Sequence, residues 1–189
     1  MSSQHSPLLF GGHPAPVRSG ERVLCFGDHC IGPGNPEAVA CLSQWYPAPF
    51  MEGSLRFPTA EHYMMHAKAL LFGDRFVARL VLLTDNPAEA LALGRMARGF
   101  DGAAWASQRE VIVFRGNMLK FGQHSGLRAH LRASAPRLLV DANPADMIWG
   151  AGLAASDPRI DEPSAWPGKN KLGEVLMRVR ATLMPACAL

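Results

Sequence analysis

The chain has only four cysteines among its 189 residues, and none of them forms a Cys-x-x-Cys pair. Cysteines 25, 30, 41 and 187 therefore give no zinc-ribbon signature, and free thiols in a reducing cytosol are expected. Residues 1–20 lack the apolar core of a signal peptide. No apolar run approaches the roughly 20 residues that a membrane-spanning helix requires. These absences favour a cytoplasmic protein without a membrane span.

Several common catalytic signatures are also missing. The sequence has no Gly-x-Ser-x-Gly elbow, no Walker A loop and no Gly-x-Gly-x-x-Gly fingerprint. These gaps argue against a serine hydrolase of the elbow type, a P-loop NTPase and a Rossmann dinucleotide enzyme. The formal net charge of +3 is too small to indicate nucleic-acid binding without a local basic patch.

The pattern of helix formers and breaks predicts a mainly α protein. Residues 1–20, rich in Ser, Pro, Gly and His, are expected to be a flexible leader, and residues 21–185 a single compact multihelical domain with a few short β-strands near the N-terminus. We expect strands at 22–26, 50–51, 55–57 and 137–141, and helices from about residue 60 and over 74–83, 86–98, 103–121, 125–134 and 171–183. The irregular stretch 143–171 is long enough to suggest a functional loop.

The segment 57–70 is the centre of the functional argument. Pro58 and Thr59 predict a capped helix start, which places Glu61 in the first turn near the positive end of the helix dipole. We expect the Glu61 carboxylate to remain ionised and to meet a positive charge or activate a water. The other interpretation is an ordinary dipole partner. Tyr63, Ala67, Leu70 and Leu71 form a stripe expected to face the core, and Glu61, Met65 and Lys68 form a second stripe.

His62 and His66 have the i, i+4 spacing of a two-histidine metal site. Glu61 precedes the first histidine, so the segment is not His-Glu-x-x-His, and no third ligand is obvious. We therefore predict no metal, with one histidine packed in the core and the other facing solvent or a pocket.

Two later segments have features of a nucleotide-like site. Lys169 and Asn170 lie in a Gly-Lys-Asn-Lys-Leu-Gly run at a helix start, where an anion can bind, although the run could equally be a polar helix start. Trp149 stands beside Gly150 in a loop, where an indole face can stack on a planar base, or it could belong to the core. Asp146 supplies a second carboxylate that could flank a ribosyl carbon together with Glu61.

Taken in order, these motifs resemble the NADAR, or YbiA-like, family over residues 22–184. The resemblance rests on Thr-Ala-Glu-His-Tyr-Met (59–64), Gly-Arg (94–95), Lys-Phe (120–121), Asp-x-x-Trp-Gly-x-Gly (146–152) and Gly-Lys-Asn-x-Leu-Gly (168–173). It implies a compact, mostly helical fold and N-glycosidase activity on ribosylated amines, such as the ribosylaminopyrimidine intermediates of riboflavin synthesis. It also implies a catalytic role for Glu61 and a place in the pocket for Asp146, which we expect to assist catalysis by positioning water or a sugar hydroxyl. The substrate-binding residues expected from it are Ser43, Trp45, His62, Arg95, Lys120, Trp149, Gly150, Lys169 and Asn170.

The sequence departs from the family pattern at two places. Ser43-Gln44-Trp45 replaces the family's Ser-Asn-Phe, and residues 154–167 form an insertion-like stretch. We expect both to border the pocket. No metal or redox cofactor is required for the expected hydrolysis. The alternatives are an enzyme that removes ADP-ribose from guanine in nucleic acid, and a module that binds ADP-ribose or NAD without cleaving it. The sequence leaves the oligomeric state open.

Overall fold

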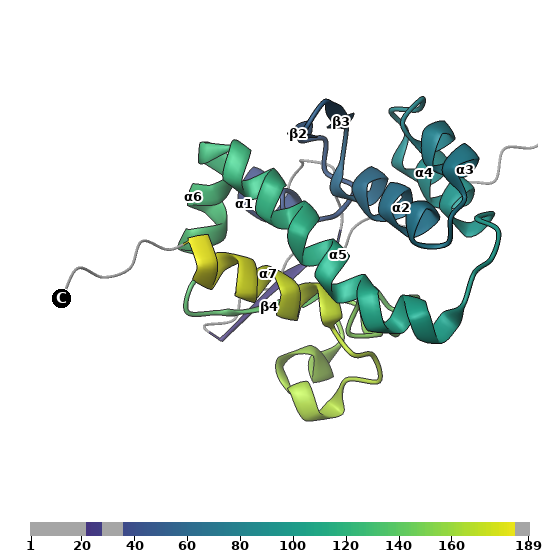
Figure 1. The fold of residues 1–189 in the computed structure, drawn as a ribbon. Helices are drawn as coiled ribbons and strands as arrows, with labels where there is room; N and C mark the ends of the chain where they lie inside the picture. Colours follow the sequence, from purple (N-terminus) through teal and green to yellow (C-terminus); the bar gives the residue numbers. More distant parts are fainter. Residues whose placement is uncertain (1–21, 28–35, 184–189) are drawn as a thin grey trace, which may run out of the picture.

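Helices are the main secondary structure of the computed structural model, which describes residues 22–27 and 36–183 (Figure 1). The predicted leader, residues 1–20, lies outside the described residues. The helices are α1 (Glu37–Ala40), α2 (Ala60–Leu71), α3 (Arg75–Val81), α4 (Pro87–Arg95), α5 (Gly102–Gln123), α6 (Ser125–Ala133) and α7 (Lys171–Leu183). The mainly α prediction is confirmed. No helix of the described part of the chain is long and apolar enough to cross a membrane.

Side-chain caps explain where these helices begin. The Thr59 hydroxyl accepts a hydrogen bond from the His62 backbone N–H at 3.4 Å, as the sequence predicts for α2. Asp74, Asn86 and Asp101 cap α3, α4 and α5 in the same way, at 3.0, 2.9 and 2.7 Å. These caps satisfy free N–H groups and fix the direction in which each helix leaves its loop.

Two small sheets connect distant parts of the chain. Strand β1 (Val23–Phe26) pairs in parallel with β4 (Leu138–Asp141), so that Phe26 faces Asp141 across the ladder. Strands β2 (Phe50–Glu52) and β3 (Leu55–Phe57), both at predicted strand positions, form an antiparallel hairpin. The β1–β4 pair brings the end of β4 to the region where residues 41–45 and α2 meet.

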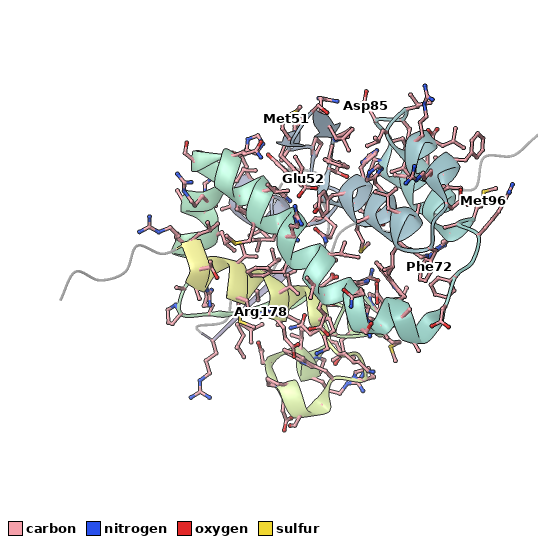
Figure 2. The ribbon with its side chains drawn as sticks, viewed as in Figure 1. Met51, Glu52, Phe72, Asp85, Met96 and Arg178 are labelled. Atoms are coloured by element: carbon pink, nitrogen blue, oxygen red, sulfur yellow. The ribbon has the colours of Figure 1, made fainter. Side chains whose placement is uncertain are left out.

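Helix α2 packs against α3, α4 and α5, and α5 in turn packs against α7. Gly94 allows α4 to approach α2 closely, because an added Cβ would overlap the Met65 side chain. The hairpin is tied to this core by Glu52, labelled in Figure 2, which accepts a hydrogen bond from the Tyr63 hydroxyl at 3.3 Å and pairs with Arg115 of α5 at 2.5 Å.

The expected core stripe on α2 is only partly correct. Tyr63 is buried and Ala67 is half-buried, but Leu70 and Leu71 are exposed. The predicted stripe is wrong at Leu70 and Leu71 because only the last turn of α2 lies at the surface. The first half of the helix is buried on nearly every side. As a result even the charged residue of the first turn, Glu61, is buried.

Candidate active site

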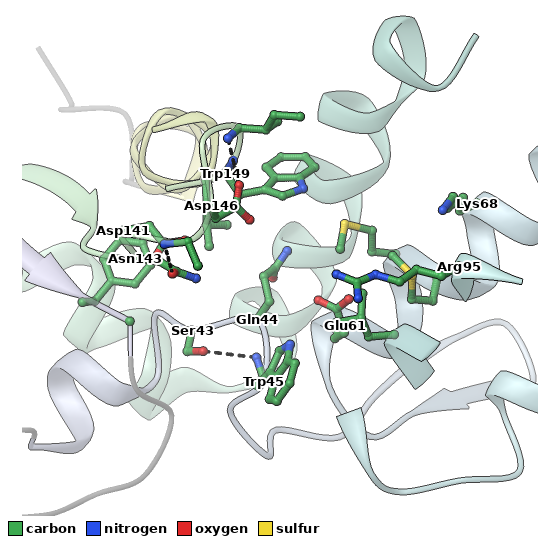
Figure 3. Close-up of a pocket in the computed structure, with 18 of the residues that line it drawn as sticks. Ser43, Gln44, Trp45, Glu61, Lys68, Arg95, Asp141, Asn143, Asp146 and Trp149 are labelled. Atoms are coloured by element: carbon green, nitrogen blue, oxygen red, sulfur yellow. Dashed lines mark hydrogen bonds between the residues drawn. The ribbon is translucent and has the colours of Figure 1, made fainter. Parts of the chain in front are cut away.

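A cavity of about 730 Å³ opens between the first half of α2, the segment 43–45 and the loop that follows β4 (Figure 3). It is lined by Phe26, Gly27, Ser43, Gln44, Trp45, Glu61, Met64, Met65, Lys68, Leu91, Arg95, Trp105, Asp141, Asn143, Ala145, Asp146, Ile148, Trp149 and Leu172. Of the predicted site residues, the structure brings together Glu61, Asp146, Ser43, Trp45, Arg95 and Trp149. Glu61 and Asp146, distant in sequence, share this space.

Glu61 is the buried carboxyl group on the helical side of the cavity. It is 4% exposed, and its Oε1 has no hydrogen-bond partner among the described residues. Burial raises its pKa to about 7, opposed by a hydrogen bond from the Trp45 side chain and by the positive charges of Arg95 and Lys68. This pKa is higher than the expectation of a firmly ionised carboxylate implies, because desolvation by burial is the largest influence on Glu61. A pKa near 7 instead allows Glu61 to act as a base at neutral pH.

Lys68 and Arg95 make the helical side electropositive. Lys68 lies two turns after Glu61 on α2, and its Nζ is 4.7 Å from the centre of the Phe100 ring and 5.7 Å from that of Trp105. Burial and the nearby Arg95 lower the pKa of Lys68. Figure 3 shows Arg95 reaching from α4 toward the Glu61 carboxylate. Two cations beside a cavity are suited to binding a phosphate or another anionic group.

Lys120, predicted to bind substrate, is buried behind the cavity instead. Its ammonium group donates to the carbonyl oxygens of Cys41 and Ser43 at 2.7 and 2.8 Å, and it is not among the lining residues. Burial lowers its pKa to about 7. One turn earlier on α5, Asn117 donates to the Gln44 side chain at 3.1 Å. Lys120 therefore holds the segment that carries Ser43, Gln44 and Trp45.

The opposite side of the cavity is a loop rich in acidic and amide groups. Asp146 accepts hydrogen bonds from the backbone N–H groups of Ile148 and Trp149, both at 2.8 Å, and these bonds fix the backbone of the loop that carries Trp149. Gly150 does not line the cavity. It is buried beneath the loop, where an added Cβ would lie 2.8 Å from the Asp146 carbonyl oxygen. Its role is to let the loop fold tightly.

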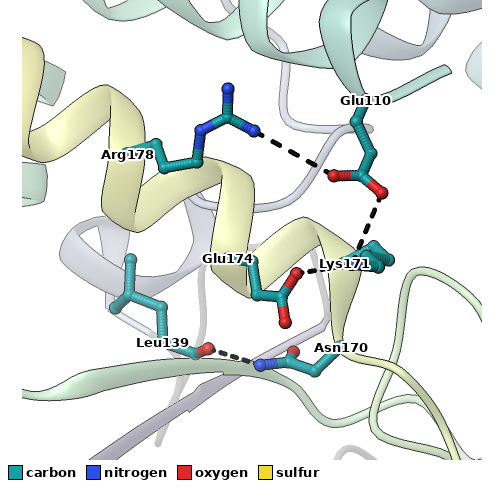
Figure 4. Close-up of polar contacts among 6 residues, drawn as sticks. All are labelled: Glu110, Leu139, Asn170, Lys171, Glu174 and Arg178. Atoms are coloured by element: carbon teal, nitrogen blue, oxygen red, sulfur yellow. Dashed lines mark hydrogen bonds and ion pairs between the residues drawn. The ribbon is translucent and has the colours of Figure 1, made fainter. Parts of the chain in front are cut away.

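The Gly168–Gly173 motif also serves the scaffold. Asn170 has a left-handed backbone, with φ of 48°, and its amide donates to the Leu139 carbonyl at 2.9 Å and accepts from the Asp141 N–H at 3.0 Å. Figure 4 shows the hydrogen bond between Asn170 and Leu139. It lies beside an ionic cluster in which the Lys171 Nζ is 3.4 Å from the Glu110 carboxylate. The Lys169 side chain is exposed, and neither it nor Asn170 lines the cavity. The anion-site interpretation of this motif is therefore replaced by a bridge between α7 and β4.

The two histidines of α2 also have structural partners. His62 is fully buried, with Nδ1 2.8 Å from the Thr59 hydroxyl, and it does not line the cavity. The Nδ1 atom of His66 lies 2.9 Å from the Ala78 carbonyl oxygen. Within the residues that the structure describes, no group of three or more potential ligands is placed to hold a metal ion.

The insertion-like stretch 154–167 does not border the cavity, contrary to expectation. It contains two short 3₁₀ turns, η1 (Pro158–Asp161) and η2 (Pro163–Ala165), and its Ile160 and Trp166 pack with Val23 and Val140 on the β1–β4 pair. The expectation that Ser43-Gln44-Trp45 borders the pocket is confirmed, but sequence reasoning missed other lining residues with polar or aromatic groups: Phe26, Lys68, Trp105, Asp141 and Asn143. The position of Asp141 at the end of a buried strand was the only available signal.

The chain is similar to several known proteins. The sequence matches the family model of the NADAR domain over residues 33–184. N-glycosidase R617 of Acanthamoeba polyphaga mimivirus is 38% identical over 151 residues, covering 77% of this chain and 89% of the relative. N-glycosidase YbiA of Escherichia coli is 32% identical over 127 residues, covering 67% and 71%. The NMR structure of E. coli YbiA superposes with a TM-score of 0.68 at 27% identity, covering 88% of each chain. The resemblance predicted from the sequence is confirmed.

Proposed function

This chain belongs to the NADAR domain family and is an N-glycosyl hydrolase, and we propose that it hydrolyses the C1–N bond of ribosylated amines. The substrate class that we favour is a ribosylaminopyrimidine phosphate, an early intermediate of riboflavin synthesis. The observation that carries the proposal is the cavity itself, in which a buried carboxyl group faces two cations and several aromatic rings.

Glu61 is the group proposed to act on the reacting carbon. Cleavage of the C1–N bond builds positive charge on the ribose ring, and a buried carboxylate such as that of Glu61 stabilises this charge more strongly than a carboxylate in water. With its pKa near 7, the ionised form of Glu61 can also take a proton from the attacking water. The Trp45 hydrogen bond keeps the carboxyl group directed into the cavity.

The other lining residues suit the remaining parts of such a substrate. Lys68 and Arg95 would bind the phosphate, and Trp149 and Trp105 would pack against the leaving base. Ser43 offers a hydroxyl group for the ribose. In this proposal, the predicted binding residues His62, Lys120, Gly150 and Asn170 support the cavity rather than touch the substrate. Lys169 contributes only its backbone N–H, which donates to the Met147 carbonyl at 3.1 Å.

Glu61→Gln tests the role of the carboxylate, because it keeps the shape of the side chain and removes its charge. We expect kcat to fall by about 10²–10⁴-fold with little change in KM. Glu89→Gln, an exposed position on α4 outside the cavity, is the matched control and should retain full activity. A loss of less than about tenfold in Glu61→Gln would exclude a catalytic role.

Product analysis by mass spectrometry tests the substrate class. The protein is incubated with a ribosylaminopyrimidine phosphate and, separately, with an oligonucleotide carrying ADP-ribosylated guanine. Release of ribose phosphate from the first substrate alone supports the proposal. Release of ADP-ribose from the second alone would replace it with a function on nucleic acid. Salt should weaken binding of the oligonucleotide much more steeply than binding of the small substrate.

A further inference from the structure

Asp141 ends β4 at the cavity, and its backbone is firmly held there. It pairs with Phe26 across the β1–β4 ladder, its N–H donates to the Asn170 side chain at 3.0 Å, and its carbonyl oxygen accepts from the Ala151 N–H at 2.8 Å. The side chain lines the cavity and is 8% exposed. Its carboxyl group forms no hydrogen bond with any residue in the described part of the chain.

The surroundings of Asp141 favour a proton on its carboxyl group. Burial and the negative charge of Asp146 both raise its pKa, to about 7. Glu61 has a similar pKa for a different reason, because burial there is opposed by the Trp45 hydrogen bond and by Arg95 and Lys68. The cavity therefore holds two buried carboxyl groups, one beside cations and one beside an anion. When environments differ in this way, the group beside cations carries the negative charge and the other carries the proton.

We infer that Asp141 is the general acid that protonates the departing nitrogen when the C1–N bond breaks. This inference rests on the proposed function. The proton of the Asp141 carboxyl group moves to the nitrogen, which keeps the electron pair of the broken bond and leaves as a neutral amine. Water adds to C1 and gives a proton to the Glu61 carboxylate. Asp141 then regains a proton from solvent and Glu61 loses one, so that both groups return to their starting forms.

The chemistry gives a reason why the Asp141 carboxyl group has no hydrogen-bond partner among residues 22–27 and 36–183. Amines are poor leaving groups unless protonated, and a hydrolase for ribosylamines therefore needs an acid near the nitrogen. A buried carboxyl group without hydrogen bonds reduces the stability of the fold, and such groups cluster where catalysis uses them. Asp146 cannot take this role as readily, because its Oδ1 is occupied by two backbone N–H groups.

A series of N-aryl ribosylamine phosphates tests the inference. The substrates differ only in the aniline that leaves, from para-methoxyaniline, which needs protonation, to para-nitroaniline, which leaves readily without it. We expect Asp141→Asn to reduce kcat about 100-fold on the first and less than about fivefold on the second. Asp85→Asn, at an exposed carboxylate outside the cavity, is the matched control and should match the wild type on both.

An equal loss on every aniline would overturn the acid role of Asp141, and so would no loss on any. If the wild-type protein cleaves neither the aniline series nor the aminopyrimidine substrate, the proposed function itself is wrong.

A measurement on the wild type alone covers the case in which Asp141→Asn does not fold. The rate on the para-methoxy substrate should fall as pH rises above about 7, where Asp141 loses its proton, and the rate on the para-nitro substrate should not. Identical profiles would contradict the inference.

Discussion

The two sides of the cavity contain the same chemical group in opposite surroundings. On the helical side, Glu61 lies in the first turn of α2, with Lys68 and Arg95 close by. On the loop side, Asp141 lies at the end of a strand, with Asp146 close by. Both carboxyl groups are buried, and both have a pKa near 7. Burial raises the pKa of both carboxyl groups. The neighbouring charges differ, and they determine which group is ionised and which is protonated.

The two sides also differ in what holds them. Glu61 is positioned by local structure, because the Thr59 cap begins the helix and the Glu61 N–H donates to the Gln44 carbonyl at 3.0 Å. Asp141 is positioned by contacts far apart in the sequence, through β1 and through Asn170 at the start of α7. The loop side is therefore more sensitive to changes distant from the cavity.

Asn170→Ala is the strongest test of that difference. The substitution leaves the Asp141 N–H and the Leu139 carbonyl without partners and places a Cβ-bearing residue with no polar side chain at a φ of 48°. We expect a loss of about 4 kcal/mol in the free energy of unfolding, measured by urea denaturation, from two unpaired buried groups and backbone strain.

Asn170→Gly is the matched control, because glycine accepts this backbone conformation but forms neither bond. It should lose about 1 kcal/mol less than Asn170→Ala. If both variants are as stable as the wild type, Asn170 does not hold the loop side of the cavity. The loop side would then not depend on this distant contact, and that difference between the two sides would be wrong.

The same difference explains what the sequence could predict. The cap at Thr59, the helix at residue 60 and the location of Glu61 follow from local patterns, and the structure confirms them. The convergence of β1, β4 and the 143–149 loop depends on pairing between distant segments, so Asp141 was missed as a lining residue. Motif residues such as Lys120 and Asn170 were identified, but whether a polar side chain faces substrate or backbone depends on the tertiary fold. The raised pKa of Glu61 likewise depends on burial by other helices.

Glu61→Gln should stabilise the protein at alkaline pH. The pKa of Glu61 rises from 4.5 to about 7 on folding, so between these values the folded state binds more protons than the unfolded state. Stability from this group therefore falls as pH rises through that window. The free energy of unfolding of the variant lacks this fall, so it should exceed that of the wild type by about 3 kcal/mol at pH 8 but match it near pH 4.

Urea denaturation of both proteins across this pH range measures the effect. Asp141 contributes a fall of the same sign in both, so the difference between the two curves reports Glu61 alone. If the free energy of unfolding of the two proteins changed with pH in parallel, the pKa of Glu61 would be the same in the folded and unfolded states. Glu61 would then not be desolvated on folding.

Arg95→Met gives a smaller effect and tests the electropositive side directly. The positive charge of Arg95 lowers the pKa of Glu61, so its removal should raise that pKa and move the acidic limb of the pH–rate profile upward by about one unit. Since Glu61 acts in its ionised form, kcat relative to the wild type should be about tenfold lower near pH 6 and only about twofold lower at pH 8. Arg98→Met, at an exposed arginine outside the cavity, should leave the acidic limb unchanged.

The basic limb of the pH–rate profile reports Asp141, whose pKa is raised by burial and by Asp146. Arg95 does not contribute to that pKa, so the basic limb should remain in place. A shift of both limbs together would show that the two carboxyl groups titrate as one coupled pair, and the division of the cavity into a cationic and an anionic side would then be wrong.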